Sequence, residues 1–184
     1  MIRRPPRSTQ GVSSAASDVY KRQGTVSPPL TSPEISASDI RRAAIAIYWP
    51  DVPPRIYWDA EYADNSVWKG LIAPEEMNPF AWMVGRAHVG PQPERINSEQ
   101  DTLENLRAMK PPGGLANFLF GGVESEYFTM MRPGDTITSV ITAGDIYEKS
   151  GSTGVMLFYI THETWTNQKQ QIIKKTRTTN IEWE

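Results

Sequence analysis

The sequence predicts an α+β domain in which an antiparallel β-sheet wraps around a central helix. Four segments rich in β-branched and aromatic residues follow one another between residues 121 and 183, separated by short turn sequences. Upstream, apolar side chains recur at i, i+3, i+4 and i+7, which predicts a helix over residues 74–86 with one buried face. A sheet of this kind needs an apolar partner for one face, and this helix is the candidate. The recurring side chains are Met77, Phe80, Ala81 and Val84.

The first 23 residues, MIRRPPRSTQGVSSAASDVYKRQ, differ in composition from the rest of the chain. They hold five of the 19 basic residues but only one of the 21 acidic ones. They lack the apolar stretch of a secretory signal, whereas their composition is compatible with a mitochondrial transit peptide or a basic disordered arm. The stretch also resembles the translation of sequencing-adapter DNA fused to gene fragments from environmental (metagenomic) samples. We therefore predict that it is non-native and dispensable, and that the native N-terminus is missing.

The remaining chain carries 14 basic and 20 acidic residues, and this mildly acidic balance argues against binding to a phosphate backbone. No run approaches the roughly 18 apolar residues of a membrane-spanning helix, so we expect no membrane partner. With no cysteine there is no thiolate or disulfide chemistry, which fits a cytoplasmic location. We predict a disordered leader and linker over residues 1–35, then a single domain over 36–184 with an insertion around 90–117.

A short amphipathic helix is predicted to begin at Ser36. The Ser36 hydroxyl and the Asp39 carboxylate, three residues apart, are typical of a capped N-terminus. Pro50 ends the helix, because proline disfavours the helical conformation in the residue before it. The apolar face comprises Ile40, Ala43, Ala44 and Ile47.

Prolines interrupt the segment that follows. Pro53 and Pro54 exclude regular structure there, and residues 59–65 fit one or two helical turns. Pro79 lies inside the predicted central helix, so either the helix kinks at this point or Asn78 and Pro79 begin a new one.

The C-terminal half is predicted to form an antiparallel meander, because its strand segments are joined by short turns. RPGD is a tight Pro-Gly turn, KSGSTG a Gly-rich hairpin and TNQKQ a short connection. The predicted strands span residues 121–131, 135–148, 154–166 and 171–183.

A short first helix followed by a sheet around a central helix is the hot-dog arrangement. The segments IRRAAIAIYWPDVPPRIYWDAEYA, GLIAP, GGVESEYFTMMRPGDTIT, IYEKSGSTGVMLFYITHETWTN and KKTRTTNIEW occur in the order typical of one family. Over residues 36–184 the chain resembles the N-terminal-type domain of MaoC-like dehydratases, which are hot-dog enoyl-CoA hydratases and dehydratases. The resemblance implies an acyl-CoA thioester substrate, no cofactor, and a homodimer or a heterodimer with a catalytic hot-dog chain.

Catalytic members of that family carry D-x-N-P-L-H, whose Asp and His activate the water that adds to a trans-2-enoyl thioester. At the matching segment this chain keeps Asp51, but Ile56 replaces the histidine and Tyr57 follows it. The segment that polarises the thioester oxygen in relatives, Ala-His-Gly, is here Ala73-Pro74-Glu75-Glu76. The resemblance therefore implies a catalytic remnant at Asp51, and a substrate-binding set that consists of Tyr57, Trp58, Ala73, Glu75 and Glu76.

Each candidate also has a structural interpretation. Asp51 is either that remnant or a loop cap between a helix and two prolines. Tyr57 and Trp58 either line an acyl tunnel or belong to the core. Glu75 and Glu76 are either catalytic carboxylates or acids favoured by the dipole of a helix N-terminus. The two histidines, His88 and His162, have no metal-ligand spacing and argue against a metal site.

Three functions fit this sequence. In the first, the chain is the non-catalytic or weakly catalytic half of an (R)-specific 2-enoyl-CoA hydratase or dehydratase, and it shapes the acyl-CoA pocket for a catalytic partner. Alternatively, it is a thioesterase-like hot dog that uses Glu75 or Glu76, or an acyl-CoA-binding scaffold without chemistry of its own.

Overall fold

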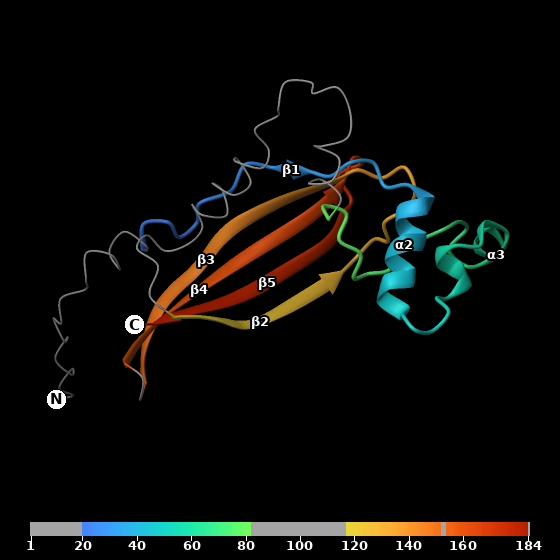
Figure 1. Cartoon of the computed structure of the whole chain (residues 1–184). Coiled ribbons are helices and arrows are strands. Elements are labelled where there is room, and N and C mark those ends of the chain that lie inside the picture. Colours follow the sequence, from blue (N-terminus) through green and yellow to red (C-terminus); the bar gives the residue numbers. More distant parts are fainter. Residues whose placement is uncertain (1–19, 82–116, 152–153, 184) are drawn as a thin grey trace, which may run out of the picture.

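The computed structural model describes residues 20–81, 117–151 and 154–183, and Figure 1 shows one antiparallel sheet with the helices gathered at one end. Its five strands lie in the order β1-β3-β4-β5-β2. The two hairpins β3–β4 and β4–β5 confirm the predicted short connections. The strands are β1 (Leu30–Thr31), β2 (Asn117–Tyr127), β3 (Ile137–Gly151), β4 (Gly154–Asn167) and β5 (Ile172–Trp183).

The first predicted helix is confirmed as α2 (Ala37–Tyr48). The Asp39 N–H donates to Ser36 Oγ, and the Ser36 N–H donates to the Asp39 carboxylate, so the two residues form a complete capping box. Ile40 and Ala44 are fully buried, whereas Ile47 remains 40% exposed because only the first turns of the helix reach the core. The helix ends just before Trp49 and Pro50, as predicted.

Two short helices follow α2 and lie with it at the same end of the sheet (Figure 1). They are the 3₁₀ helix η1 (Arg55–Tyr57) and α3 (Ala60–Asn65). Asp59 caps α3 by accepting from the Tyr62 N–H, and its carboxylate also pairs with Arg55 at 2.6 Å. The predicted helical turns at 59–65 are thereby confirmed.

The central helix predicted over residues 74–86 is not found in its described part. Residues 74–81 form turns, and residues 82–86 lie outside the described chain. Pro74 and Pro79 have no N–H to donate, and the Asn78 side chain accepts from the Phe80 N–H in place of a helical bond. Met77 is nevertheless buried, and Phe80 packs edge-on against Trp165 with ring centroids 5.3 Å apart.

The predicted order of strands in the meander is wrong at β2. β2 pairs with β5 at the far edge of the sheet, so the chain crosses the sheet between Tyr127 and Ile137. The predicted Pro-Gly turn is present, with the Asp135 N–H donating to the Arg132 carbonyl. That turn lies within the crossing segment between β2 and β3. This segment is hydrogen-bonded to Ala73 and Trp68, so β2 and β3 do not pair with each other although the turn joins them.

Part of the predicted linker is ordered against the free edge of β3. The Gly24 N–H donates to the Ala143 carbonyl, and the Gln23 side chain donates to Asp145 at 3.0 Å. Leu30 and Thr31 then pair with β3 as β1. Extended proline-containing chain has no internal hydrogen bonds, so an open sheet edge is its natural partner. The insertion around 90–117 lies almost wholly outside the described residues, and the division into domains stays a prediction.

The apolar core lies where α2 and the 72–80 segment meet the sheet. Trp165 and Ile137 contribute from β4 and β3, and Ile40 contributes from α2. The remaining members include Ile35, Met77, Met131 and Ile173. This core holds the ends of β2, β4 and β5 against the segment that carries the predicted thioester-polarising residues.

Candidate functional site

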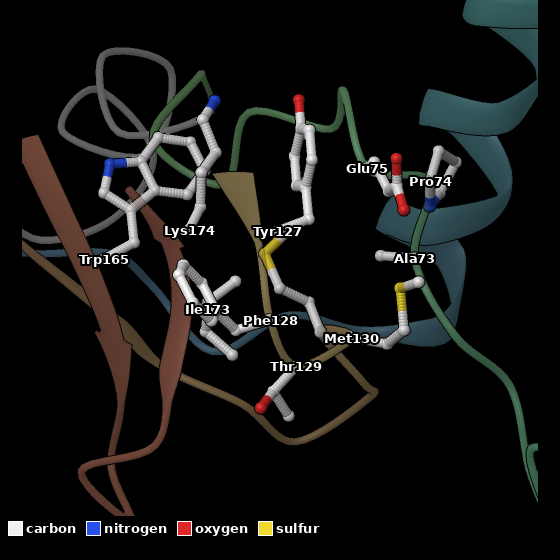
Figure 2. A pocket seen from close by; sticks show the side chains of 11 residues that line it. Ala73, Pro74, Glu75, Tyr127, Phe128, Thr129, Met130, Trp165, Ile173 and Lys174 are labelled. Carbon is white, nitrogen blue, oxygen red and sulfur yellow. The ribbon is translucent and has the colours of Figure 1, made fainter. Parts of the chain in front are cut away.

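A pocket opens at the end of the sheet nearest the helices, between the 73–75 segment and the ends of β2, β4 and β5 (Figure 2). It is partly open to solvent, and its cavity volume is about 50 Å³. Apolar side chains form most of its lining, and four polar side chains lie around it. The polar residues are Glu75, Tyr127, Thr129 and Lys174.

One wall of the pocket is the predicted thioester-polarising segment. The Ala73 N–H donates to the Met131 carbonyl at 2.8 Å, which fixes this wall to the crossing between β2 and β3. Ala73 is 2% exposed and Pro74 is fully buried, whereas Glu75 and Glu76 are exposed. Because the Ala73 N–H is engaged and Pro74 has none, these two amides cannot both serve a thioester oxygen as an oxyanion hole does.

The opposite wall is formed by β4 and β5 around Lys174. Its ammonium lies 4.3 Å from the centre of the Trp165 ring and 5.6 Å from that of Tyr127. Cation–π contacts of this kind hold a lysine in place without neutralising its charge. No carboxylate of the described residues forms an ion pair with Lys174.

Tyr127, the last residue of β2, stands between these walls in Figure 2. Partial burial raises the pKa of its phenol, and the negative charges of Glu76 and Glu75 raise it further. The phenol is therefore neutral at physiological pH and is available as a hydrogen-bond donor.

Tyr57 is partly buried and packs against the apolar core. Burial is the main cause that raises the pKa of Tyr57, with contributions from Tyr48, whose hydroxyl is 3.5 Å away, and from Glu76 and Glu75. The Tyr48 and Tyr57 ring centroids are 5.8 Å apart. Tyr57 packs against the apolar core and is absent from the pocket lining, as its core interpretation expects.

Asp51 and Trp58 lie on the helical side of the molecule, outside the pocket lining. Asp51 is exposed, and its backbone N–H donates to the Tyr48 carbonyl at 2.7 Å, which closes the turn after α2. The Trp58 indole donates to the Pro53 carbonyl at 2.9 Å and stiffens the proline loop. Of the predicted site residues, the structure thus brings Ala73 and Glu75 to the pocket lining. Asp51, Tyr57, Trp58 and Glu76 are not part of it.

Sequence reasoning missed three residues of the pocket. Tyr127, Trp165 and Lys174 come from three strands, and they meet only because β2 crosses to the edge beside β5. The register pairs Tyr127 with Lys174 and Lys174 with Trp165, so the three lie in one row across the sheet. The predicted meander placed β2 beside β3, so it did not bring Tyr127 next to Lys174.

The described residues contain neither a cluster of metal-ligating side chains nor a membrane-spanning helix. Within residues 20–81, 117–151 and 154–183, no three His, Cys, Asp or Glu side chains are grouped as metal ligands. His162 lies exposed on β4, and His88 is outside the described chain. No helix in this same part of the chain has the length and apolar character needed to cross a bilayer.

The antiparallel sheet, with the pocket at its end beside Ala73, has the hot-dog arrangement. The model of the FAS1-like dehydratase domain region matches residues 23–176, and the chain belongs to this family of hydro-lyase enzymes. The search of curated proteins finds no match.

Solved structures share the fold at low sequence identity. The ChsH1-ChsH2 complex from Mycobacterium tuberculosis matches with a TM-score of 0.63 and 16% identity, over 92% of this chain and 89% of that one. The HadBC (3R-hydroxyacyl-ACP dehydratase) complex from the same organism gives 0.57 and 14%, over 87% and 96%. The (R)-hydratase PhaJ1 from Pseudomonas aeruginosa gives 0.53 and 15%, over 88% and 82%. These similarities confirm the hot-dog fold.

Proposed function

We propose that this chain is the non-catalytic or weakly catalytic half of an (R)-specific 2-enoyl-CoA hydratase or dehydratase, and that it shapes the acyl-CoA pocket for a catalytic hot-dog partner. The observation that carries the proposal is the position of Asp51, which is exposed and has Ile56 where a histidine is needed. Water addition to an enoyl thioester requires a base and an acid within reach of the reacting atoms. Neither Asp51 nor a described histidine reaches the pocket lining.

The edge strand β2 supports assembly with another hot-dog chain. Within the described part of the chain, β5 is the only strand that pairs with β2, and no described strand covers the other edge of β2. Phe118, Leu119, Phe120 and Val123 are each about half exposed, which is unusual for an edge strand that stays unpaired. Because Tyr127 ends the same strand, a partner strand on β2 runs toward the pocket.

Two of the similar solved structures are complexes: ChsH1-ChsH2, and the (3R)-hydroxyacyl-ACP dehydratase HadBC. This fold therefore occurs in complexes of two chains. We propose by the same reasoning that the partner here is a hot-dog chain with an intact Asp–His pair, or a second copy of this chain. The lack of cysteine supports a cytoplasmic location.

A thioesterase-like activity of Glu75 is the second candidate, because Glu75 is the one carboxylate among the described residues that line the pocket. Glu76 adds charge from the same turn. An acyl-CoA-binding scaffold is the third function and differs from the first only by having no catalytic partner.

The deciding experiment measures crotonyl-CoA hydration and thioester hydrolysis by the purified chain alone and mixed with an intact-motif hot-dog partner. We expect negligible hydration by the chain alone, since correct acid–base placement contributes roughly 10²–10⁴-fold, and a marked rise in the mixture. Hydrolysis that Glu75→Gln abolishes identifies the thioesterase. Binding without any activity in either setting identifies the scaffold.

A further inference from the structure

Lys174 is a half-buried cation that has no counter-ion in the described part of the chain. No described carboxylate pairs with it, and its ammonium makes no hydrogen bond to a described acceptor. The ammonium lies 4.3 Å from the centre of the Trp165 ring and 5.6 Å from that of Tyr127. These contacts hold it in place but leave its three N–H donors unused. Because a charge withdrawn from water is unfavourable without a partner, this position favours an anionic ligand.

The Tyr127 hydroxyl supplies a second donor beside this ammonium. Tyr127 and Lys174 are register partners on β2 and β5, and Figure 2 shows their side chains extending in the same direction. The pKa of the phenol is raised, chiefly by partial burial, so the hydroxyl keeps its proton. Glu75 and Glu76 are exposed, so water and salt screen their charges more than the charge of half-buried Lys174. The two donors therefore face one site for an acceptor group.

A carboxylate matches this pair of donors in charge, shape and size. Both of its oxygens accept hydrogen bonds, so one can accept from Lys174 and the other from Tyr127. The cavity volume of about 50 Å³ compares with the roughly 10–15 Å³ that one buried water needs, so a group of a few heavy atoms fits and a whole ligand does not. Phe128, Met130 and Ile173 also line the pocket and suit the methylene groups next to such a carboxylate.

We propose that Lys174 and Tyr127 form a binding site for the carboxylate of a small aliphatic ligand. Two ligands can supply this group: a free carboxylic acid, or a thioester whose acyl group ends in a second carboxylate. The first source is independent of the proposed function, whereas the second rests on it. In both, the ligand carboxylate is the counter-ion that Lys174 lacks among the described residues.

The first test titrates the full chain with butyrate and with butyramide, which have the same alkyl chain but differ in charge. NMR chemical shifts give the two dissociation constants. Hydrogen bonds between charged groups lead us to expect at least about tenfold tighter binding of butyrate. Lys174→Met should remove most of this preference, Lys174→Arg should preserve most of it, and Tyr127→Phe should lower it about threefold or more. Equal affinities of the wild type for butyrate and butyramide would overturn the site.

Lys149→Met is the matched control. Lys149 also lies over two aromatic rings, those of Tyr147 and Phe158, at 5.4 and 5.0 Å, but it is exposed and absent from the pocket lining. Its loss changes the net charge equally and should leave the preference for butyrate unaltered. Equal effects of Lys149→Met and Lys174→Met would mean that net charge, and not this site, sets the preference.

Inorganic phosphate tests whether the site is specific for a carboxylate. Phosphate presents more oxygens than the two donors can satisfy, so we expect it to bind more weakly than butyrate and to compete poorly with it. If phosphate binds more tightly, and Lys174→Met weakens that binding, Lys174 is a general anion site and the carboxylate assignment is wrong.

A pair of thioesters distinguishes the two sources of the carboxylate. S-glutaryl- and S-valeryl-N-acetylcysteamine have acyl chains of equal length that end in a carboxylate and in a methyl group. If Lys174→Met weakens only the glutaryl thioester, the acyl group supplies the carboxylate; if it weakens butyrate but neither thioester, the ligand is a free acid. Butyrate binding by a chain that binds neither thioester, alone or with the hot-dog partner, contradicts the proposed function and leaves this site standing. Thioester binding without a preference for butyrate over butyramide does the reverse.

Discussion

Ser32 and Ile137 exchange two hydrogen bonds across the edge of the sheet. The Ser32 N–H donates to the Ile137 carbonyl at 2.7 Å, and the Ile137 N–H donates to Ser32 Oγ at 2.9 Å. Ser32 is 5% exposed and Ile137 is fully buried, so these two hydrogen bonds attach the chain before α2 to the edge of β3 beside the core. The chain before α2 is thus part of the fold at this point.

Deletions of two lengths should show which part of the N-terminal region contributes to stability. The sequence predicts that residues 1–23 are non-native and dispensable, so deleting residues 1–19 should change the melting temperature by less than about 1 °C. Deleting residues 1–32 removes β1 and the Ser32–Ile137 bonds, and should lower the melting temperature by several degrees, since about 1 kcal/mol corresponds to roughly 2–4 °C at this chain length. Differential scanning calorimetry checks both. A large drop already in the shorter deletion contradicts the interpretation of the first 19 residues.

The capping box of α2 should contribute measurably to stability. Ser36→Ala removes the acceptor for the Asp39 N–H and should lower the free energy of unfolding by about 1 kcal/mol. Ser36→Asp keeps an acceptor but places it beside the Asp39 carboxylate, and should recover only part of the loss. Urea denaturation of the three proteins measures the differences, and an unchanged midpoint in Ser36→Ala rules out the cap as a stabilising feature.

The exposed edge of β2 should be the assembly surface. Phe120→Lys places a charge at the centre of the β2 edge, where Phe120 is 55% exposed, and should shift the protein toward monomer by size-exclusion chromatography with light scattering. Val26→Lys is the control, because Val26 is similarly exposed, at 62%, and pairs with Thr142 at the opposite edge. Equal loss of assembly in both variants contradicts the assignment to β2.

Tyr57 should make stability fall in alkaline solution. Its pKa is raised in the folded state, chiefly by burial, so the unfolded chain loses this proton at lower pH than the folded one. The resulting stabilisation is fully present below about pH 10, the ordinary pKa of tyrosine, and is lost as the pH rises above it. Tyr57→Phe should therefore lose less stability than the wild type between pH 9 and pH 11, by thermal unfolding. Tyr62→Phe, at an exposed phenol, should behave like the wild type.

Asp51→Asn should have little effect on hydration by the mixed complex, because Asp51 is exposed and lies outside the pocket lining. Replacing the histidine of the partner's motif should abolish turnover. The measurement is kcat for crotonyl-CoA. Hydration by the isolated chain that is lost in Asp51→Asn contradicts the proposed division of roles and directs attention to Tyr57 as the acid.

The sequence by itself determined the local elements of this protein. The spacing of Ser36 and Asp39, the proline at 50 and the β-branched segments specify α2 and four strands, because caps, prolines and alternation act over a few residues. The order of motifs was sufficient to predict the hot-dog fold. The sequence also shows that Ile56 stands at the position where the family motif has a histidine.

Only the tertiary structure decided where β2 pairs and what surrounds the pocket. Strand order depends on long-range contacts, here the hydrogen bond from Ala73 to Met131 and the pairing of β2 with β5, which short turns do not specify. The same crossing brings Tyr127, Trp165 and Lys174 into one row opposite Glu75. Residues 74–81 form turns because Asn78 and two prolines oppose a helix that the apolar spacing alone favoured.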